Sequence, residues 1–321
     1  MTMTSPDTYR LLTRSDMDGL VSAVLLRELG MLGAVEFLHP KDMQDGLIPV
    51  TERDIITNLP YVEGCGLCFD HHSSEERRLD GRPTPGYVLE PNAKSAARVV
   101  YDFYGGLSAF PKIDLDMMEA VDRADSADFT REDVLEPKGW ALLSFLMDAR
   151  TGLGRFHDFR ISNYELMMQL IDCCRDMSID EILALPDVAE RVELYHDQHE
   201  RFVEQVERVA EVRDNLVVLD LRAEDVIYAG NRFVVYALFP DCDISMHVMW
   251  GRERRNTVYT VGKSIFDRSS SVDVGGLMLR HGGGGHHAAG TCQGPNETAD
   301  QLKAELIDEI VALSQRVRVT A

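Results

Sequence analysis

Short apolar segments alternate with helical segments over the first third of the chain. Four runs of apolar and β-branched residues, each bounded by turn-forming residues, predict strands at 9–14, 35–39, 54–58 and 66–70. The apolar density of residues 19–29 and of the segment from about residue 95 predicts two helices between and after these strands. This alternation is typical of an α/β fold with a mainly parallel sheet that helices cover.

The pattern turns helical from about residue 115 to 185, and residues 188–212 predict one long amphipathic helix. A coiled-coil dimer helix would carry a similar apolar stripe. We favour a connector between two domains, because the apolar pattern directly afterwards predicts strands at 216–219, 226–228 and 232–239.

The pattern therefore predicts three parts of the chain. Residues 1–187 form the sheet domain, residues 188–215 form the helical connector, and residues 216–321 form a smaller C-terminal α/β domain. A chain of 321 residues is long enough to bury two separate cores.

The cysteines and the N-terminal segment bear on the compartment. The six cysteines lack the spacing of a disulfide framework, and no apolar run approaches the roughly 20 residues that span a bilayer. The first residues resemble no secretory signal. We expect a soluble, cytoplasmic protein without a membrane partner. Cys65 and Cys68 form a CxxC pair, for which we favour buried apolar positions over a metal or redox site.

The formal net charge of -21 restricts the partners of the protein. Long nucleic acids are usually held by a basic surface that displaces counterions. We therefore expect no binding to long duplexes, and a polyanionic partner should be short or held at a local basic site backed by metal.

Asp16 and Asp18 lie in an acidic turn between a predicted strand and a predicted helix. Open α/β folds bind ligands at this edge of the sheet, and hard cations such as Mg²⁺ or Mn²⁺ favour carboxylate oxygens. The alternative is an exposed capping turn with Asp18 as the N-cap.

Asp70, His71 and His72 directly follow a second predicted strand. An aspartate beside two histidines can supply a metal ligand, an orienting partner and a general acid. Further along, Asp122 and Asp125 have the spacing of one helical face, which spacing alone would assign to solvent.

A run of glycines at 282–285 precedes His286 and His287. Glycine lets the backbone approach a ligand closely and present its N–H groups to an anion. A flexible turn is the simpler interpretation of the glycines alone.

Taken together, these motifs resemble the DHH/DHHA1 phosphoesterase superfamily, which includes oligoribonucleases, phosphoadenosine phosphatases, cyclic-dinucleotide phosphodiesterases and RecJ exonucleases. The resemblance rests on four ordered motifs that span almost the whole chain: Thr13–Gly19 (TRSDMDG), Phe69–His72 (FDHH), Ala124–Phe129 (ADSADF) and Gly283–Gly290 (GGGHHAAG). It implies an N-terminal DHH domain and a C-terminal DHHA1 domain that binds the substrate.

The resemblance also implies the roles of individual residues. It places Asp16 on one divalent metal, Mn²⁺ or Mg²⁺, and Asp18, His71 and Asp125 on another. His72 would contact the scissile phosphate or its leaving oxygen, and Asp70 would orient the histidines. Gly284, Gly285 and His286 would bind the far end of the substrate, with Arg268 as an additional phosphate clamp. The implied reaction is in-line attack on phosphorus by a metal-activated hydroxide.

Two positions depart from the pattern of the family. Arg14 replaces a metal-binding histidine, and a guanidinium has no lone pair for a metal. Asn58 stands where an aspartate normally bridges both metals, and its amide oxygen brings no charge. Arg14 would then act as a fixed cation beside the phosphate.

Three hypotheses about function follow. The first is a metal-dependent phosphoesterase acting on a small phosphorylated substrate: a short oligonucleotide, a dinucleotide, pAp or, as in exopolyphosphatase-related proteins, polyphosphate. The second is a nucleotide- or nucleic-acid-binding homologue that has lost catalysis. The third, a structural protein with solvated acidic turns, leaves the joint occurrence of the motifs unexplained. A homodimer is compatible with each.

Overall fold

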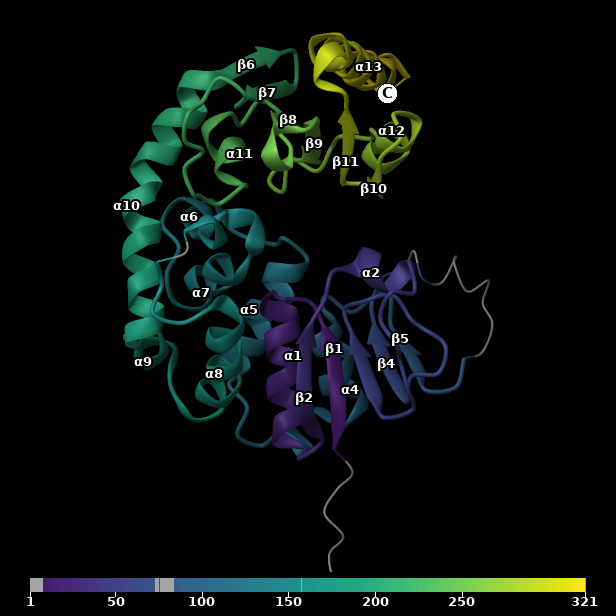
Figure 1. The fold of residues 1–321 in the computed structure, drawn as a ribbon, viewed down its shortest axis with the longest axis vertical. Coiled ribbons are helices and arrows are strands. Elements are labelled where there is room, and N and C mark those ends of the chain that lie inside the picture. Colours follow the sequence, from purple (N-terminus) through teal and green to yellow (C-terminus); the bar gives the residue numbers. More distant parts are fainter. Residues whose placement is uncertain (1–7, 73–74, 76–83, 157, 321) are drawn as a thin grey trace, which may run out of the picture. The chain divides into compact units, whose positions relative to one another are not determined.

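The computed structural model describes residues 8–72, 75, 84–156 and 158–320 (Figure 1). The chain divides into two compact units, one comprising Met1–Phe129 with Pro137–Leu194 and the other Thr130–Glu136 with Tyr195–Ala321. Each unit is built around a sheet of its own. The predicted α/β class is confirmed, with a parallel sheet in the N-terminal part and a second, mixed sheet in the C-terminal part.

The first unit contains a five-stranded parallel sheet in the order β2-β1-β3-β4-β5. Its strands are β1 (Tyr9–Thr13), β2 (Leu32–Phe37), β3 (Asp54–Thr57), β4 (Leu67–Asp70) and β5 (Tyr87–Leu89). All four residues of β3 are buried, as expected for a strand covered on both faces.

Helices cover this sheet, and the helix that follows β1 is deeply buried. The α-helices of the first unit are α1 (Met17–Glu28), α2 (Pro40–Gln44), α4 (Ala96–Phe103), α5 (Leu115–Asp125), α7 (Gly139–Met147), α8 (Asn163–Asp176) and α9 (Ile179–Leu183). Helix α1 is buried from Met17 to Leu26 and packs against α4, α5 and α8. It is therefore apolar around most of its circumference rather than along one stripe.

The turn from β1 into α1 is unusually tight. A Cβ atom at Gly19 would lie 1.9 Å from the carbonyl oxygen of Arg14 and 2.9 Å from Oγ1 of Thr13. Glycine is therefore required at this position for steric reasons, which explains the last residue of the DxDG motif. The close approach brings the start of α1 directly against the end of β1.

The second unit contains a six-stranded mixed sheet in the order β10-β11-β9-β8-β7-β6. Its strands are β6 (Ala210–Arg213), β7 (Leu216–Asp220), β8 (Ile244–Trp250), β9 (Thr257–Lys263), β10 (Gly284–His286) and β11 (Ala289–Gly294). Helices α12 (Val274–Arg280) and α13 (Ala299–Thr320) contribute Leu277 and Leu306 to the core on one face of this sheet.

Two helices define where one unit ends and the other begins. The predicted long helix is α10 (Pro186–Val209), along which the boundary between the two units falls. The short helix α6 (Arg131–Leu135) belongs to the second unit, although it lies between segments of the first in the sequence. Within the described ranges, no helix combines the length and the apolar character that crossing a membrane requires.

The strand predictions at 226–228 and 232–239 are wrong. Residues 226–228 form no regular element, and the second segment contains the helix α11 (Val234–Leu238). Val234, Val235 and Tyr236 are all buried. A short apolar run that is buried on every side has no period by which a strand could be distinguished from a helix.

The prediction for the CxxC pair is confirmed. Cys65 and Cys68 are free thiols that pack in an apolar cluster with Leu12 and Ile56. Burial raises the pKa of Cys65 to about 11, so this thiol stays protonated and unreactive at neutral pH.

Replacing Gly19 with alanine should destabilise the first unit by about 1 to 3 kcal/mol, because its Cβ would collide with backbone that cannot move independently. Urea denaturation measures the change. Gly154→Ala is the matched control, since the nearest atom to its Cβ would be Nδ2 of Asn163 at 3.6 Å. Equal unfolding midpoints for Gly19→Ala and the parent chain would contradict the steric role assigned to Gly19.

Candidate metal-binding active site

Three neighbouring strands of the first sheet end at the same edge and present polar residues there. Arg14 to Asp18 follow β1, Asn58 follows β3, and Asp70 to His72 lie at the end of β4. Because β1, β3 and β4 are adjacent and parallel, their carboxyl ends converge. The sheet order reverses direction at β1, which is the place where open α/β sheets bind ligands.

The carboxylate of Asp18 is held by the N-terminus of α4. Its Oδ1 accepts a hydrogen bond from the backbone N–H of Ala97 at 2.7 Å, and its Oδ2 accepts one from Ala96 at 3.0 Å. Asp18 is 1% exposed. Burial, and next to it the carboxylate of Asp125, raise the pKa of Asp18 well above its ordinary value. A positive partner would therefore stabilise the charged form.

His71 faces the same point from β4. Its Nδ1 lies 3.2 Å from the carbonyl oxygen of Ala93, which can only accept, so Nδ1 carries a proton. Nε2 lies 2.8 Å from Oδ2 of Asp125, with which it forms an ion pair when the ring is protonated. A histidine fixed through one nitrogen by a backbone carbonyl has the arrangement of a metal ligand.

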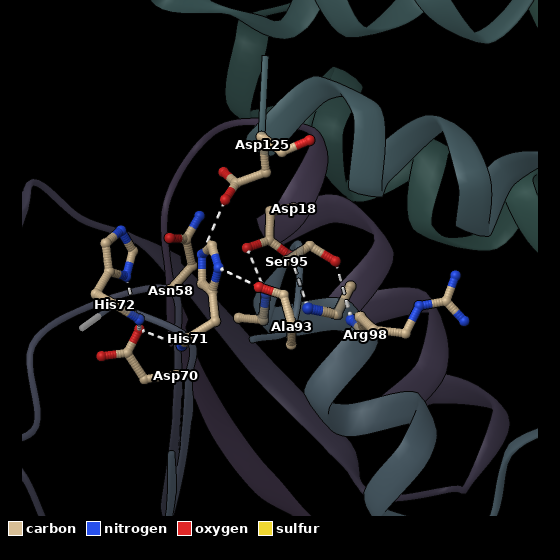
Figure 2. A network of polar contacts seen from close by, with 12 residues as sticks. Asp18, Asn58, Asp70, His71, His72, Ala93, Ser95, Arg98 and Asp125 are labelled. Atoms are coloured by element: carbon tan, nitrogen blue, oxygen red, sulfur yellow. Dashed lines mark hydrogen bonds and ion pairs between the residues drawn. The ribbon is translucent and has the colours of Figure 1, made fainter. Parts of the chain in front are cut away.

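Asp18, His71 and Asp125 form a compact cluster (Figure 2). One potential ligand atom of each lies within 4.8 Å of the other two. The buried Oδ1 of Asn58 has no hydrogen-bond partner among the described residues. A hard divalent cation fits this donor set of carboxylates, one imidazole and one amide oxygen, and it would satisfy the orphaned Oδ1 of Asn58.

The charge state of His71 reflects its neighbours. Burial opposes protonation of the ring, but the carboxylates of Asp125, Asp18 and Asp70 outweigh it and raise the pKa of His71 to about 9. In the metal-free protein the imidazolium therefore occupies the position of a cation at neutral pH.

Asp16 lies outside this cluster and has other partners. Its Oδ1 accepts from the backbone N–H of Gly19 at 3.0 Å, and its Oδ2 lies 3.2 Å from Nε of Arg14. The side-chain amide of Asn58 is 3.5 Å from Oδ1. Burial raises the pKa of Asp16, and the charge of Arg14 partly offsets this. A guanidinium thus lies against the carboxylate that the family resemblance assigns to a metal.

Asp70 contacts both of the histidines that follow it. Its Oδ1 accepts from the backbone N–H groups of His71 and His72 and lies 2.7 Å from Nδ1 of His72. The hydroxyl of Tyr87, on β5, donates to Oδ2 at 3.2 Å. Sequence reasoning missed Tyr87, because a tyrosine in a strand is ordinary core composition.

Two further groups near the cluster have contacts that the sequence did not predict. Asp122 accepts from Ser95 and from Arg98, so it braces the start of α4 and does not point to the cluster with Asp125. Arg150 is fixed by Asp148 through Nε, and its charge interacts with Asp16 and Asp125. No motif marks these contacts in the sequence, since both depend on tertiary packing.

The predicted substrate-binding residues Gly284, Gly285 and His286 form β10 in the second unit. Gly285 has φ +155°, and a Cβ on it would lie 2.3 Å from the carbonyl oxygen of Ala289. Gly285 is therefore needed for the hairpin itself, whatever ligand the segment binds. Arg268 lies in the exposed segment after β9, where its Nε donates to the carbonyl of Ile265.

One solved structure is that of PggH, the pGpG-specific phosphodiesterase of Vibrio cholerae, which is 58% identical to this chain in sequence. The match covers 95% of this chain and 99% of PggH, with a TM-score of 0.84. This chain belongs to the DHH/DHHA1 phosphoesterase superfamily. The prediction of a hydrolase acting on phosphoester bonds is thereby confirmed.

A second solved structure extends the likeness at the level of the fold. RecJ from Thermus thermophilus, in complex with Mn²⁺, is 16% identical, with a TM-score of 0.50 over 94% of this chain and 52% of RecJ. Comparison with models of protein families and with curated proteins gives no match.

The pKa of His71 predicts how the stability of metal-free protein depends on pH. Since this pKa, about 9, is above the unfolded value near 6.5, the stabilisation is fully present below pH 6.5 and is lost as pH rises through 9. Urea denaturation in EDTA at pH 7 and pH 10 should show a loss on the order of 1 to 3 kcal/mol. In His71→Asn this part of the loss should disappear, and an identical pH dependence in both proteins would refute the assignment.

Proposed function

We propose that the chain is a divalent-metal-dependent phosphodiesterase that hydrolyses short linear dinucleotides such as pGpG. The convergence of Asp18, His71 and Asp125 carries the proposal. The substrate class is suggested by PggH, which is pGpG-specific. A short anion also suits a chain with a formal net charge of -21 better than a long duplex does.

Asp18, His71 and Asp125 would hold the cation, and the orphaned Oδ1 of Asn58 would complete the donor set. Mn²⁺ or Mg²⁺ bound there supplies Lewis-acid chemistry to the phosphoester. The amide N–H groups of Ala96 and Ala97 fix the orientation of Asp18 before any metal binds. The ligand set is thus preorganised on one side by a helix N-terminus.

His72 is the proposed acid for the leaving oxygen. Asp70 accepts from Nδ1 of His72, so this nitrogen keeps its proton and Nε2 is the nitrogen that would exchange a proton with the substrate. The Asp70 carboxylate also compensates positive charge on the ring when Nε2 carries the proton to be donated. The His72 side chain is 32% exposed, which leaves it accessible to a ligand.

Arg14 and Arg150 are proposed to bind the phosphate in place of a second cation. Arg14 contacts Asp16, and Arg150 lies in the field of Asp16 and Asp125. Guanidinium groups match the geometry of phosphate oxygens and remain charged at every relevant pH.

The ion pair between Arg14 and Asp16 favours a second candidate function, that of a nucleotide-binding protein without catalysis. Arg14 takes up the carboxylate of Asp16 that a metal would need, and Asn58 lacks the negative charge of the bridging aspartate in the family. If the reaction needs two cations, this site would bind the dinucleotide without cleaving it.

Binding of Mn²⁺ should raise the melting temperature of the parent chain, because a ligand that binds only the folded state stabilises it. Asp125→Asn should abolish this rise and lower the rate of pGpG hydrolysis at least about a hundredfold, the scale of losing one group that stabilises transition-state charge. Differential scanning fluorimetry and chromatographic detection of GMP measure the two effects.

Asp128→Asn is the matched control for this prediction. Asp128 follows Asp125 in the same motif, but its side chain is 62% exposed and forms an ion pair with Lys94 at the surface. It should keep both the Mn²⁺ response and the activity. A parent chain whose melting temperature ignores Mn²⁺ would eliminate the metal site.

The double substitution Arg14→His with Asn58→Asp separates the two candidate functions. It supplies the imidazole and the carboxylate that a second cation requires, so bound Mn²⁺ should rise from one to two per chain. If Arg14 serves the reaction as proposed, hydrolysis by the parent chain is already strong and the double variant gains little. A nearly inactive parent chain with a large gain in the variant would establish the binding protein instead. Metal analysis and pGpG turnover measure these outcomes.

A further inference from the structure

Two of the three proposed metal ligands depend on where helices α4 and α5 lie. Asp125 is the last residue of α5. Asp18 accepts its two hydrogen bonds from the N–H groups of Ala96 and Ala97, the first two residues of α4. Ligands of a cation must be held within about 0.5 Å of their productive positions. The contact between α4 and α5 therefore sets the separation of the two carboxylates.

Apolar packing alone fixes this separation loosely. Helix α1, which carries Asp18, packs against both α4 and α5. The buried residues of α5 are Met117, Met118 and Val121. The hydrophobic effect has no direction, and unbranched methionine side chains adapt when a neighbouring helix shifts. A polar contact with defined geometry would fix the register of α5 along α4 more closely.

Asp122 forms such a contact, one turn before Asp125 on α5. Its Oδ1 accepts a hydrogen bond from the hydroxyl of Ser95 at 2.8 Å, and its Oδ2 accepts from Nε and Nη2 of Arg98 at 2.9 and 2.7 Å. In the chain, Ser95 and Arg98 directly flank the two residues whose N–H groups hold Asp18, and Figure 2 shows both at the start of α4. We call Ser95, Arg98 and Asp122 the α4–α5 clamp.

The α4–α5 clamp is largely shielded from water. Ser95 is buried, and the side chains of Arg98 and Asp122 are 24% and 15% exposed. The guanidinium of Arg98 also lies over the ring of Tyr101, 5.2 Å from its centroid. Charge-assisted hydrogen bonds are shorter and stronger than neutral ones, and water competes little for them at this burial. The contact therefore has a defined geometry.

We propose that Ser95, Arg98 and Asp122 are positioning residues of the metal site, which hold Asp18 and Asp125 at the separation that a divalent cation requires. They act through the two carboxylates and touch neither the cation nor the substrate. The inference rests on the proposed function and adds residues outside the four motifs that carry the family resemblance. Loss of a residue that orients a metal ligand lowers metal affinity about tenfold to a hundredfold.

Three single variants separate positioning from charge. Ser95→Ala leaves the charge unchanged, Arg98→Met removes a positive charge, and Asp122→Asn removes a negative one. If only charge near the cation mattered, the three variants would bind Mn²⁺ equally well, more tightly and more weakly than the parent chain. The α4–α5 clamp predicts that all three raise the Kd for Mn²⁺ about tenfold or more. Isothermal titration calorimetry of the full chain, below the melting temperature of each variant, measures the Kd.

Arg10→Met is the matched control for loss of stability. Arg10 donates to the buried carboxylate of Asp54 at 2.7 and 2.8 Å, near the starts of β1 and β3, which are the strand ends opposite the site. This variant should lower the melting temperature and keep the Kd of the parent chain. An unchanged Kd in the three clamp variants overturns the proposal. Changes that follow the sign of the charge, or an equal rise in Arg10→Met, overturn it as well.

A parent chain that binds no Mn²⁺ would mean that the proposed function has failed, and amide hydrogen exchange in the metal-free chain then decides the inference separately. Asp122→Asn should speed the exchange of the Ala96 and Ala97 N–H groups about tenfold or more, because their hydrogen bonds to Asp18 open more often when α4 is released from α5. NMR spectroscopy measures these rates. Exchange as slow as in the parent chain would reject the positioning role.

Discussion

The hydrogen bonds that Asp18 accepts from the N-terminus of α4 organise the candidate site. They join the turn after β1 to the first two residues of α4, Ala96 and Ala97, which lie 78 and 79 residues after Asp18 in the chain. The helix N-terminus provides N–H groups and a partial positive charge that a buried carboxylate needs. Ser95, the N-cap of α4, accepts from Arg98 N–H and donates to Asp122, which extends the same network to α5. The position of Asp125 on α5 follows from this bracing.

This arrangement has an electrostatic imbalance at its centre. Burial raises the pKa values of Asp16 and Asp18, the charge of Asp125 raises them further, and the positive charge among these groups comes from protonated His71 and from the arginines. A divalent cation would replace the proton on His71 and compensate the carboxylates together. The site therefore favours the addition of a cation. The positive charge that a cation brings would also attract a phosphate.

The sequence was sufficient to predict those parts of the candidate site that lie at the ends of strands. Asp18 and His71 follow predicted strands, and the parallel sheet brings those ends together without further information. Asp125 was grouped with them through its motif, and its carboxylate lies beside them in the structure, although helical spacing alone would have assigned it to solvent. Tyr87 and Arg150 carry no such signal, since a strand tyrosine and a turn arginine acquire their partners only through tertiary packing. The same limit explains α11, where the apolar run Val234–Leu238 has no period that distinguishes a helix from a strand.

The place of α6 in the chain bears on how the protein is made. This helix belongs to the second unit, where Nδ2 of Asn231 lies 3.5 Å from the carbonyl oxygen of Val134 and α6 packs against α11. During synthesis α6 leaves the ribosome well before α11 exists. The second unit therefore cannot complete its fold as one continuous stretch of chain. The apolar side chain of Val134 on α6 stays exposed until the later segment that contains α11 has been synthesised. Cutting the chain within α10 would place α6 and α11 on different fragments.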